Sequence, residues 1–482
     1  MTHLLRPLAA SLALLGLMVT ATAQTDEQRS TLADQQEVAV TIYNENLALV
    51  KDQRRLPLKP GASNLAFRDV SARMRPETAL LRSVSAPGSL SVLEQNFDFD
   101  LLTPAKLLEK YVGRTVTIIR TNPATGVETS EQAQVLSAAS GVVLKIGERI
   151  ETGIPGRIVY GDVPPNLRDR PTLVMALDNA GSTQQDVELS YLTGGLAWKA
   201  DYVVELNAAE DALDISGWVT LTNTSGATYR RAKLQLVAGD VNQVRPQMEG
   251  RVMAMAAPAP AMAKARSDMA EESLFEYHLY TLNRPTTIAE NQTKQVALLS
   301  GTGVPARKEL LLRGSEYYYQ SSYGDLGQKM KVAVFVEFDN KESAHLGLPM
   351  PKGVIRVYKK DRSGNAQFIG EDRVDHTPKN EKVRLKLGDA FDVTADKKQT
   401  DFKKIGGGGK YNYQFEAAFE VVLKNAKKEA VTVTVQEPMP GDWQVLSSSH
   451  PYTKGASNTA VWKVAVPAEG STTLTYRSLV RY

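Results

Sequence analysis

The stretch Val383-Arg384-Leu385-Lys386-Leu387 alternates apolar and basic side chains, and this alternation decides the fold class. Side chains two positions apart lie on the same face of a β-strand, so the stretch predicts one buried and one solvated face. The same period recurs in Val38–Ile42, Val187–Tyr191, Tyr202–Leu206, Val332–Phe338, Phe415–Leu423 and Val431–Val435. The sequence therefore predicts a mainly β, multi-domain protein built of antiparallel β-sandwiches with little helix.

The clearest helix is predicted at Thr103–Tyr111. Thr103 suits the N-cap, Pro104 suits the first turn, and Gly113 suits the far end. Strands are expected after this helix at Thr115–Ile119, Gln132–Ser137 and Val142–Ile146. Together these elements predict a small β-barrel-like domain, inserted between the two halves of the first sandwich.

These patterns divide the chain into six segments. They are a signal peptide (1–23), an N-terminal β region that forms the first half of a sandwich (24–100), the barrel-like insertion (101–165), the second half of that sandwich (166–245), a flexible Ala/Met/Pro linker (246–275) and a C-terminal β-sandwich region (276–482). The linker prediction rests on Met253–Ala263, which has neither a helical nor a strand period.

The first 23 residues have the features of a secretory signal. Arg6 supplies a positive charge, Leu8–Val19 is a short apolar run, and Ala21-Thr22-Ala23 has the small-x-small pattern of a cleavage site. We expect cleavage before Gln24 and export of the mature chain. The apolar run is shorter than the ~20 residues of a membrane span, so no transmembrane segment is expected in the mature chain.

Composition excludes several classes of function. The 482 residues include 57 Lys plus Arg and 54 Asp plus Glu, a net charge of +3, which provides no global field for nucleic acid. There is no cysteine, so disulfides, thiolate zinc sites and cysteine nucleophiles are absent. We expect no cofactor and no metal.

From about Pro171 onward, long tracts resemble a known family. They are Ser190–Tyr202 (SYLTGGLAWKADY), Gly217–Asn223, Ala232–Asn242, Gly353–Tyr358, Gly370–Pro378 and Glu437–Trp443. These tracts resemble a family of exported bacterial proteins, the domain of unknown function 4139. The resemblance implies a β-rich protein in the periplasm or at the cell surface of a bacterium. It implies no established activity, so no functional residue is transferred.

One candidate for chemistry is the polar segment Glu371–His376. His376 would act as a general base, with Glu371, Asp372 or Asp375 orienting it. In an extended chain, however, Glu371 and Asp375 lie on one face, while Asp372 and His376 lie on the other. The alternative interpretation is a polar strand end that leads into a turn.

The candidate binding surface is the tyrosine group Tyr317, Tyr318, Tyr319 and Tyr323. Exposed aromatic rings stack on sugars and are common at protein interfaces, although alternation would bury one or two of these rings.

Two further motifs resemble ligand sites but lack essential residues. Asn96, Asp98 and Asp100 have the spacing of the first calcium-loop ligands, but Leu101 replaces the required glycine. The segment from Lys397 to Gly406-Gly407-Gly408-Gly409-Lys410 lacks the Ser or Thr of a phosphate loop. We interpret it as a hairpin loop with solvated lysines.

The sequence favours a non-catalytic binding or scaffold protein for an envelope protein or glycan. The alternative is a hydrolase or transferase that processes envelope glycans or peptides, with its site at Glu371–His376. A third hypothesis is an assembly factor that exchanges strands through exposed sheet edges.

Overall fold

A computed structural model describes residues 27–44, 46–164, 167–239, 241–242, 269–406, 411–455 and 458–482. The chain forms two compact units. Unit 1 comprises the described residues of Met1–Gln36, Asp52–Ala72 and Pro76–Ser190, and unit 2 those of Glu37–Lys51, Arg73–Arg75 and Tyr191–Tyr482. The predicted signal peptide, most of the predicted linker and residues 407–410 of the glycine-rich loop lie outside the described residues.

Unit 1 contains a four-stranded sheet. Its strands, in hydrogen-bonded order, are β1 (Glu27–Ser30), β4 (Gly61–Arg68), β12 (Thr172–Asn179) and β6 (Leu90–Asp98). β1 runs parallel to β4, and the other pairs are antiparallel. β5 (Leu80–Ser83) pairs with the portion of β13 (Gln184–Thr193) that belongs to this unit. β3 (Leu47–Pro57), like β13, contributes residues to both units.

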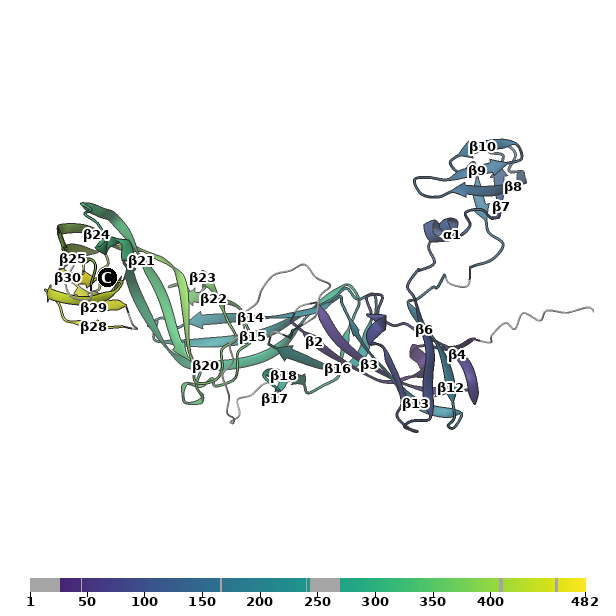
Figure 1. Ribbon diagram of the computed structural model, residues 1–482, viewed down its shortest axis with the longest axis horizontal. Coiled ribbons are helices and arrows are strands. Elements are labelled where there is room, and N and C mark those ends of the chain that lie inside the picture. The colour runs from purple at the N-terminus through teal and green to yellow at the C-terminus, as the bar shows by residue number, and fades with distance from the viewer. Residues whose placement is uncertain are drawn as a thin grey trace, which may run out of the picture. The chain divides into compact units, whose positions relative to one another are not determined.

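Between β6 and β12 the chain forms a five-stranded antiparallel sheet with one helix (Figure 1). The strand order is β10 (Arg149–Thr152), β9 (Val143–Ile146), β8 (Glu128–Ser137), β7 (Thr115–Thr121) and β11 (Arg157–Val159). The helix α1 (Pro104–Lys110) begins as predicted, because the Thr103 hydroxyl accepts a hydrogen bond from the Lys106 N–H at 3.2 Å.

This small sheet has its own core, which includes Tyr111, Ile118 and Val135. The predicted strands are present, but they form an open sheet rather than a closed barrel, since β10 and β11 stand at opposite ends of the strand order. β6 and β12, which flank the sheet in the chain, pair with each other.

Unit 2 holds the remaining strands. One group has the order β17 (Met269–Leu274), β18 (Tyr277–Leu282), β16 (Tyr229–Ala238), β2 (Gln35–Tyr43), with β19 (Thr286–Ile288) also paired to β16. β17 lies at the end of the segment 246–275, which was predicted as a flexible linker. That prediction is wrong for residues 269–274, which form a strand. Their hydrogen bonds to β18 fix them as a strand.

The second group in unit 2 is a thirteen-stranded sheet. Its main path is β23 (Ala366–Val374), β22 (Gly353–Lys360), β14 (Leu196–Leu206), β15 (Ala212–Asn223), β20 (Gln292–Arg313), β21 (Asp325–Asp339), β24 (Lys382–Ile405), β25 (Gln414–Asn425), β30 (Gly470–Arg481), β27 (Asp442–Ser448). Off this path, β26 (Val431–Pro438) pairs with β20 and β29 (Thr459–Val466), which pairs with β28 (Tyr452–Lys454). Short 3-10 helices are η1 (Leu32–Asp34), η2 (Pro76–Thr78), η3 (Glu316–Tyr319) and η4 (Glu342–Ala344).

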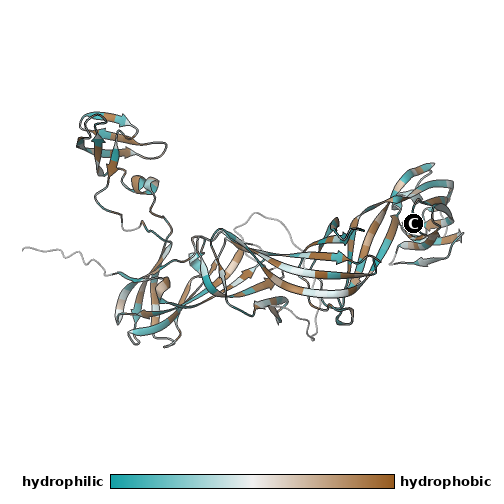
Figure 2. Cartoon of the chain, turned by 180° about the vertical axis from the view of Figure 1, so that it is seen from behind, coloured by the Kyte–Doolittle hydropathy of each residue, from teal (hydrophilic) through white to brown (hydrophobic). Residues whose placement is uncertain are grey.

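Alternation along the strands builds the cores (Figure 2). In β24, Val383 and Leu385 are buried, while Arg384 and Lys386 are solvated, as their alternation in the sequence predicts. The largest side chains of the C-terminal core include Phe419 and Trp462. Burying a large apolar side chain contributes ~1.5–3 kcal/mol, and this chain has no disulfide to add to that term. None of the helices in the described residues has the length and apolar character that a membrane span requires.

Candidate functional site

The polar segment Glu371–His376 lies at the end of β23, and its side chains have structural partners. Glu371 is exposed, and its Oε2 lies 3.2 Å from Nε of Arg356 on the neighbouring strand β22. The Asp372 carboxylate accepts hydrogen bonds from the backbone N–H of Arg373 at 2.8 Å and of Lys386 at 2.7 Å. Asp372 therefore ties β23 to β24.

The last two residues of this candidate follow the same alternation. Asp375 is exposed, whereas His376 is half-buried. The Nδ1 atom of His376 accepts a hydrogen bond from the Lys352 N–H at 3.3 Å. The structure thus places Glu371 and Asp375 in solvent and Asp372 and His376 against the protein, as strand parity predicts. Among the described residues, no cluster of three or more His, Asp or Glu side chains is arranged to hold a metal ion.

Tyr317, Tyr318 and Tyr319 lie in the 3-10 helix η3, and Tyr323 lies in the loop that follows it. The four rings form two pairs that differ in burial. Tyr318 and Tyr319 are buried in the C-terminal core. Tyr317 is 48% exposed and Tyr323 is 37% exposed. Their ring centroids lie 5.5 Å apart, with the planes at 80° to each other. We call Tyr317 and Tyr323 the tyrosine corner.

A buried glutamine holds the tyrosine corner in place. The Oε1 atom of Gln399 accepts a hydrogen bond from the Tyr323 N–H at 2.6 Å, and its Nε2 donates to the carbonyls of Tyr318 and Ser321 at 3.1 Å each. The backbone N–H of Gln399 donates to the carbonyl of Gly324 at 2.9 Å. Because Gln399 lies on the long strand β24, these four bonds fasten the loop to a rigid element.

Tyr317 also rests on the core. Its ring meets the ring of Tyr318 edge-to-face, with centroids 4.7 Å apart. Aromatic pairs of this geometry contribute about 0.5–1.5 kcal/mol beyond the area that they bury. The exposed corner is therefore ordered in advance of any contact with a partner.

Beneath the tyrosines lies a buried ion pair that sequence reasoning missed. Nζ of Lys397 is 2.6 Å from Oε1 of Glu437, and the two side chains are 1% and 0% exposed. The prediction of solvated lysines is wrong for Lys397, because it has the same strand parity as the buried Val393 and Ala395. The even spacing of Lys397 from the apolar residues Val393 and Ala395 is the sequence signal that would have predicted its burial.

Two hydroxyl groups complete the cluster. The Tyr319 O–H donates to Oε2 of Glu437 at 2.9 Å, and the hydroxyls of Tyr319 and Tyr476 lie 3.0 Å apart. Burial, followed by the charge of Glu437, raises the pKa of both phenols well above the usual value. Burial lowers the pKa of the Lys397 ammonium, although the adjacent carboxylate opposes this shift. For Tyr318, burial and the charges of its neighbours raise the pKa to about 12.

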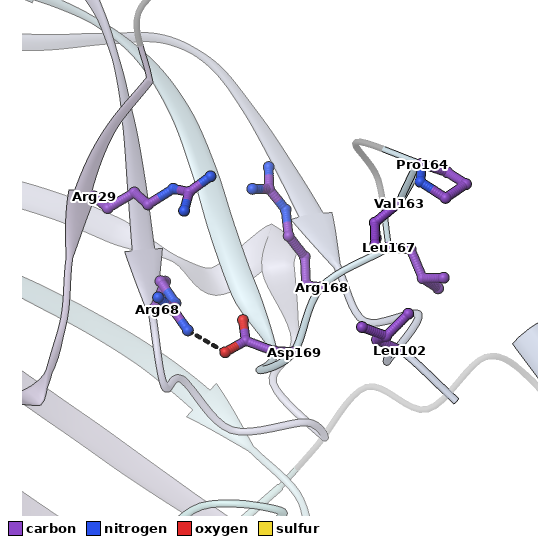
Figure 3. Close-up of a pocket in the computed structure, with 8 residues that line it drawn as sticks. All are labelled: Arg29, Arg68, Leu102, Val163, Pro164, Leu167, Arg168 and Asp169. Atoms are coloured by element: carbon purple, nitrogen blue, oxygen red, sulfur yellow. Dashed lines mark hydrogen bonds and ion pairs between the residues drawn. The ribbon is translucent and has the colours of Figure 1, made fainter. Parts of the chain in front are cut away.

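Unit 1 contains a cavity of about 270 Å³ that the sequence did not indicate. Figure 3 shows Arg29, Arg68 and Arg168 on one side of it. The other side is lined by Leu102, Val163, Pro164 and Leu167. The arginines have carboxylate partners: Glu27 for Arg29 at 3.5 Å, Asp169 for Arg68, and Glu27 at 2.7 Å and Asp98 at 2.9 Å for Arg168. Three carboxylates thus balance the three cations, which disfavours an anion-binding site here.

Comparison with known proteins points to a family without an assigned activity. No curated protein matches the chain. A family model described as a domain of unknown function, DUF4139, matches residues 187–482, which is more than half of the chain. The matched region contains the tyrosine corner, the Lys397–Glu437 pair and the Glu371–His376 segment. The chain therefore belongs to the DUF4139 family.

Proposed function

We propose that this protein is a non-catalytic scaffold, exported to the envelope of a bacterium, that binds a protein partner through the tyrosine corner. The observation that carries the proposal is the pair of exposed rings fixed by Gln399. A surface that is already ordered loses little conformational entropy on binding.

The geometry of the corner favours a protein over a glycan. Rings at 80° do not share a plane on which a chain of sugars would stack. Their two faces instead form an angle that fits one apolar or aromatic side chain, and tyrosine is enriched at protein interfaces for such contacts. A glycan remains an outcome of the test.

Export is supported by the composition of the first 23 residues, with Arg6, the apolar run Leu8–Val19 and the Ala21-Thr22-Ala23 motif. Mass spectrometry of the N-terminal peptide of the protein recovered from cells should place its first residue at Gln24, either free or cyclised to pyroglutamate. An intact N-terminus in a cytosolic fraction would contradict the proposed location.

Affinity capture tests the proposed contact. The tagged wild-type chain and a Tyr317→Ser/Tyr323→Ser variant are incubated with solubilised envelope, and bound proteins and glycans are quantified. Tyr413→Ser is the matched control, since Tyr413 is 54% exposed in the same unit but lies outside the corner. We expect the double variant to lose a protein that the wild type and the control retain. Equal capture by all three refutes the contact, and selective loss of a glycan reassigns the partner class.

A further inference from the structure

The Lys397–Glu437 pair lies in an environment that is unusual for two ionised groups. Both side chains are removed from water, and Nζ of Lys397 lies 4.3 Å from the centroid of the Tyr318 ring and 5.1 Å from that of Phe419. An ammonium has three donors, and Glu437 is the hydrogen-bond acceptor that Lys397 reaches among the described residues. Removing two charges from water carries a large penalty that a single contact repays only in part.

Transfer of one proton from the Lys397 ammonium to the Glu437 carboxylate converts the ion pair into a neutral amine beside a neutral carboxylic acid. This neutral form removes the penalty and creates a reactive pair. Burial favours the uncharged form of lysine, and an uncharged lysine amine is a nucleophile. Oε1 of the Glu437 carboxyl group is held 2.6 Å from Nζ of Lys397. Groups fixed in contact react with effective molarities that dissolved reactants do not reach.

We propose that Lys397 and Glu437 become joined by an intramolecular amide bond. Nζ attacks the Cδ carbon of Glu437 and forms the C–N bond. The C–Oε1 bond breaks, and Oε1 leaves as water with the proton of the acid and one proton from the amine. No oxidant, reductant or other reactant takes part, and Oε2 remains as the amide oxygen.

Neighbouring groups are placed to assist this step. The Tyr319 O–H donates to Oε2, which is the oxygen where negative charge develops after attack. The Tyr476 hydroxyl lies 3.0 Å from that of Tyr319 and extends the hydrogen-bonded chain. Gly314 leaves the space for the carboxyl group, because a Cβ atom at this position would lie 2.1 Å from Oε2.

The bond would link strands that are not neighbours in the sheet. Lys397 lies on β24 and Glu437 on β26, whose partners are β20 and β29. In a chain without cysteine, such a bond supplies the covalent closure that disulfides give other exported proteins. Hydrolysis of the amide bond is disfavoured, because both side chains are buried and water does not reach them.

Mass spectrometry of the denatured wild-type protein tests the proposal directly. After complete trypsin digestion, the peptides of residues 387–398 and 429–454 should appear as one linked species, lighter than their sum by one water molecule. Trypsin should not cleave after Lys397. Recovery of residues 387–397 and 429–454 as separate, full-mass peptides overturns the proposal, whatever the behaviour of variants.

Two comparisons guard against a trivial explanation. Lys398 and Glu420 are 2.7 Å apart, but Lys398 is exposed and Glu420 is only half-buried, so this pair tests whether proximity alone is sufficient, and it should remain unlinked. Lys397→Arg should abolish the linked species, and Gly314→Ala should reduce its yield by displacing the carboxyl group. A linked species that persists in Lys397→Arg, or equal linkage at Lys398 and Glu420, also refutes the assignment.

Discussion

Replacing Gln399 by methionine tests whether the tyrosine corner is held rigid by this side chain. Methionine keeps the approximate volume but removes the three side-chain hydrogen bonds to Tyr323, Tyr318 and Ser321. Each such bond contributes about 1 kcal/mol net, so the loop should lose about 3 kcal/mol of local stability. This free energy corresponds to roughly a hundredfold increase in the open population of the loop.

Amide hydrogen exchange measures that population on the peptide that covers residues 318–324. Exchange in this segment should accelerate by up to about a hundredfold, while strands β25 and β30 stay protected. Gln367→Met is the control, because Gln367 is an exposed glutamine whose single side-chain bond, to Asp361 at 3.1 Å, lies on a different hairpin. Unchanged exchange at residues 318–324 in Gln399→Met would refute the claim that Gln399 holds the loop.

Three further perturbations give independent checks. Gly364→Ala should destabilise unit 2 by about 1 kcal/mol, because Gly364 has a positive φ that alanine rarely adopts. Gly195→Ala should destabilise it more, because Gly195 also has a positive φ and its new Cβ would lie 2.6 Å from the Cα atom of Ser225. Urea unfolding measures both, and equal losses would contradict the clash. The hydrogen bond from Arg168 lowers the pKa of Glu27, so this pair should stabilise the fold above pH 4.5, the usual value for Glu, and stop doing so as pH falls through the lower folded pKa. Glu27→Gln should therefore flatten the acid loss of stability, and an unchanged pH profile would reject that role. Asp372→Ala should complement a deletion strain, because its carboxylate only ties two strands together; lost function with a native melting temperature would revive the enzyme hypothesis.

The strands were predictable because apolar and polar side chains alternate along the sequence with the period of a β-strand. Val383 and Leu385 face the core, and Thr103 and Pro104 start the helix, as local rules require. The open form of the small sheet was not predictable, because barrel closure depends on pairing between β10 and β11, and no local pattern encodes that pairing.

The candidate site was predictable only to a limited extent. In a strand, Tyr318 and Tyr319 would face opposite sides, but in the 3-10 helix both reach the core, and the sequence carries no strong signal for that turn. The charge of Lys397 suggests a solvated side chain, and only its parity with Val393 and Ala395 indicates burial. Its partner Glu437 is 40 residues away on a strand that does not pair with β24, so only the folded core brings the two side chains together.

Site-specific photo-cross-linking tests the proposed binding role most directly. A photoreactive amino acid is placed at Tyr317 in one variant and at Tyr413 in another, and living cells are irradiated. We predict a discrete protein adduct at Tyr317 that is absent at Tyr413. Irradiated cells that yield no adduct at Tyr317, or the same adducts at both positions, would contradict a binding role for the tyrosine corner.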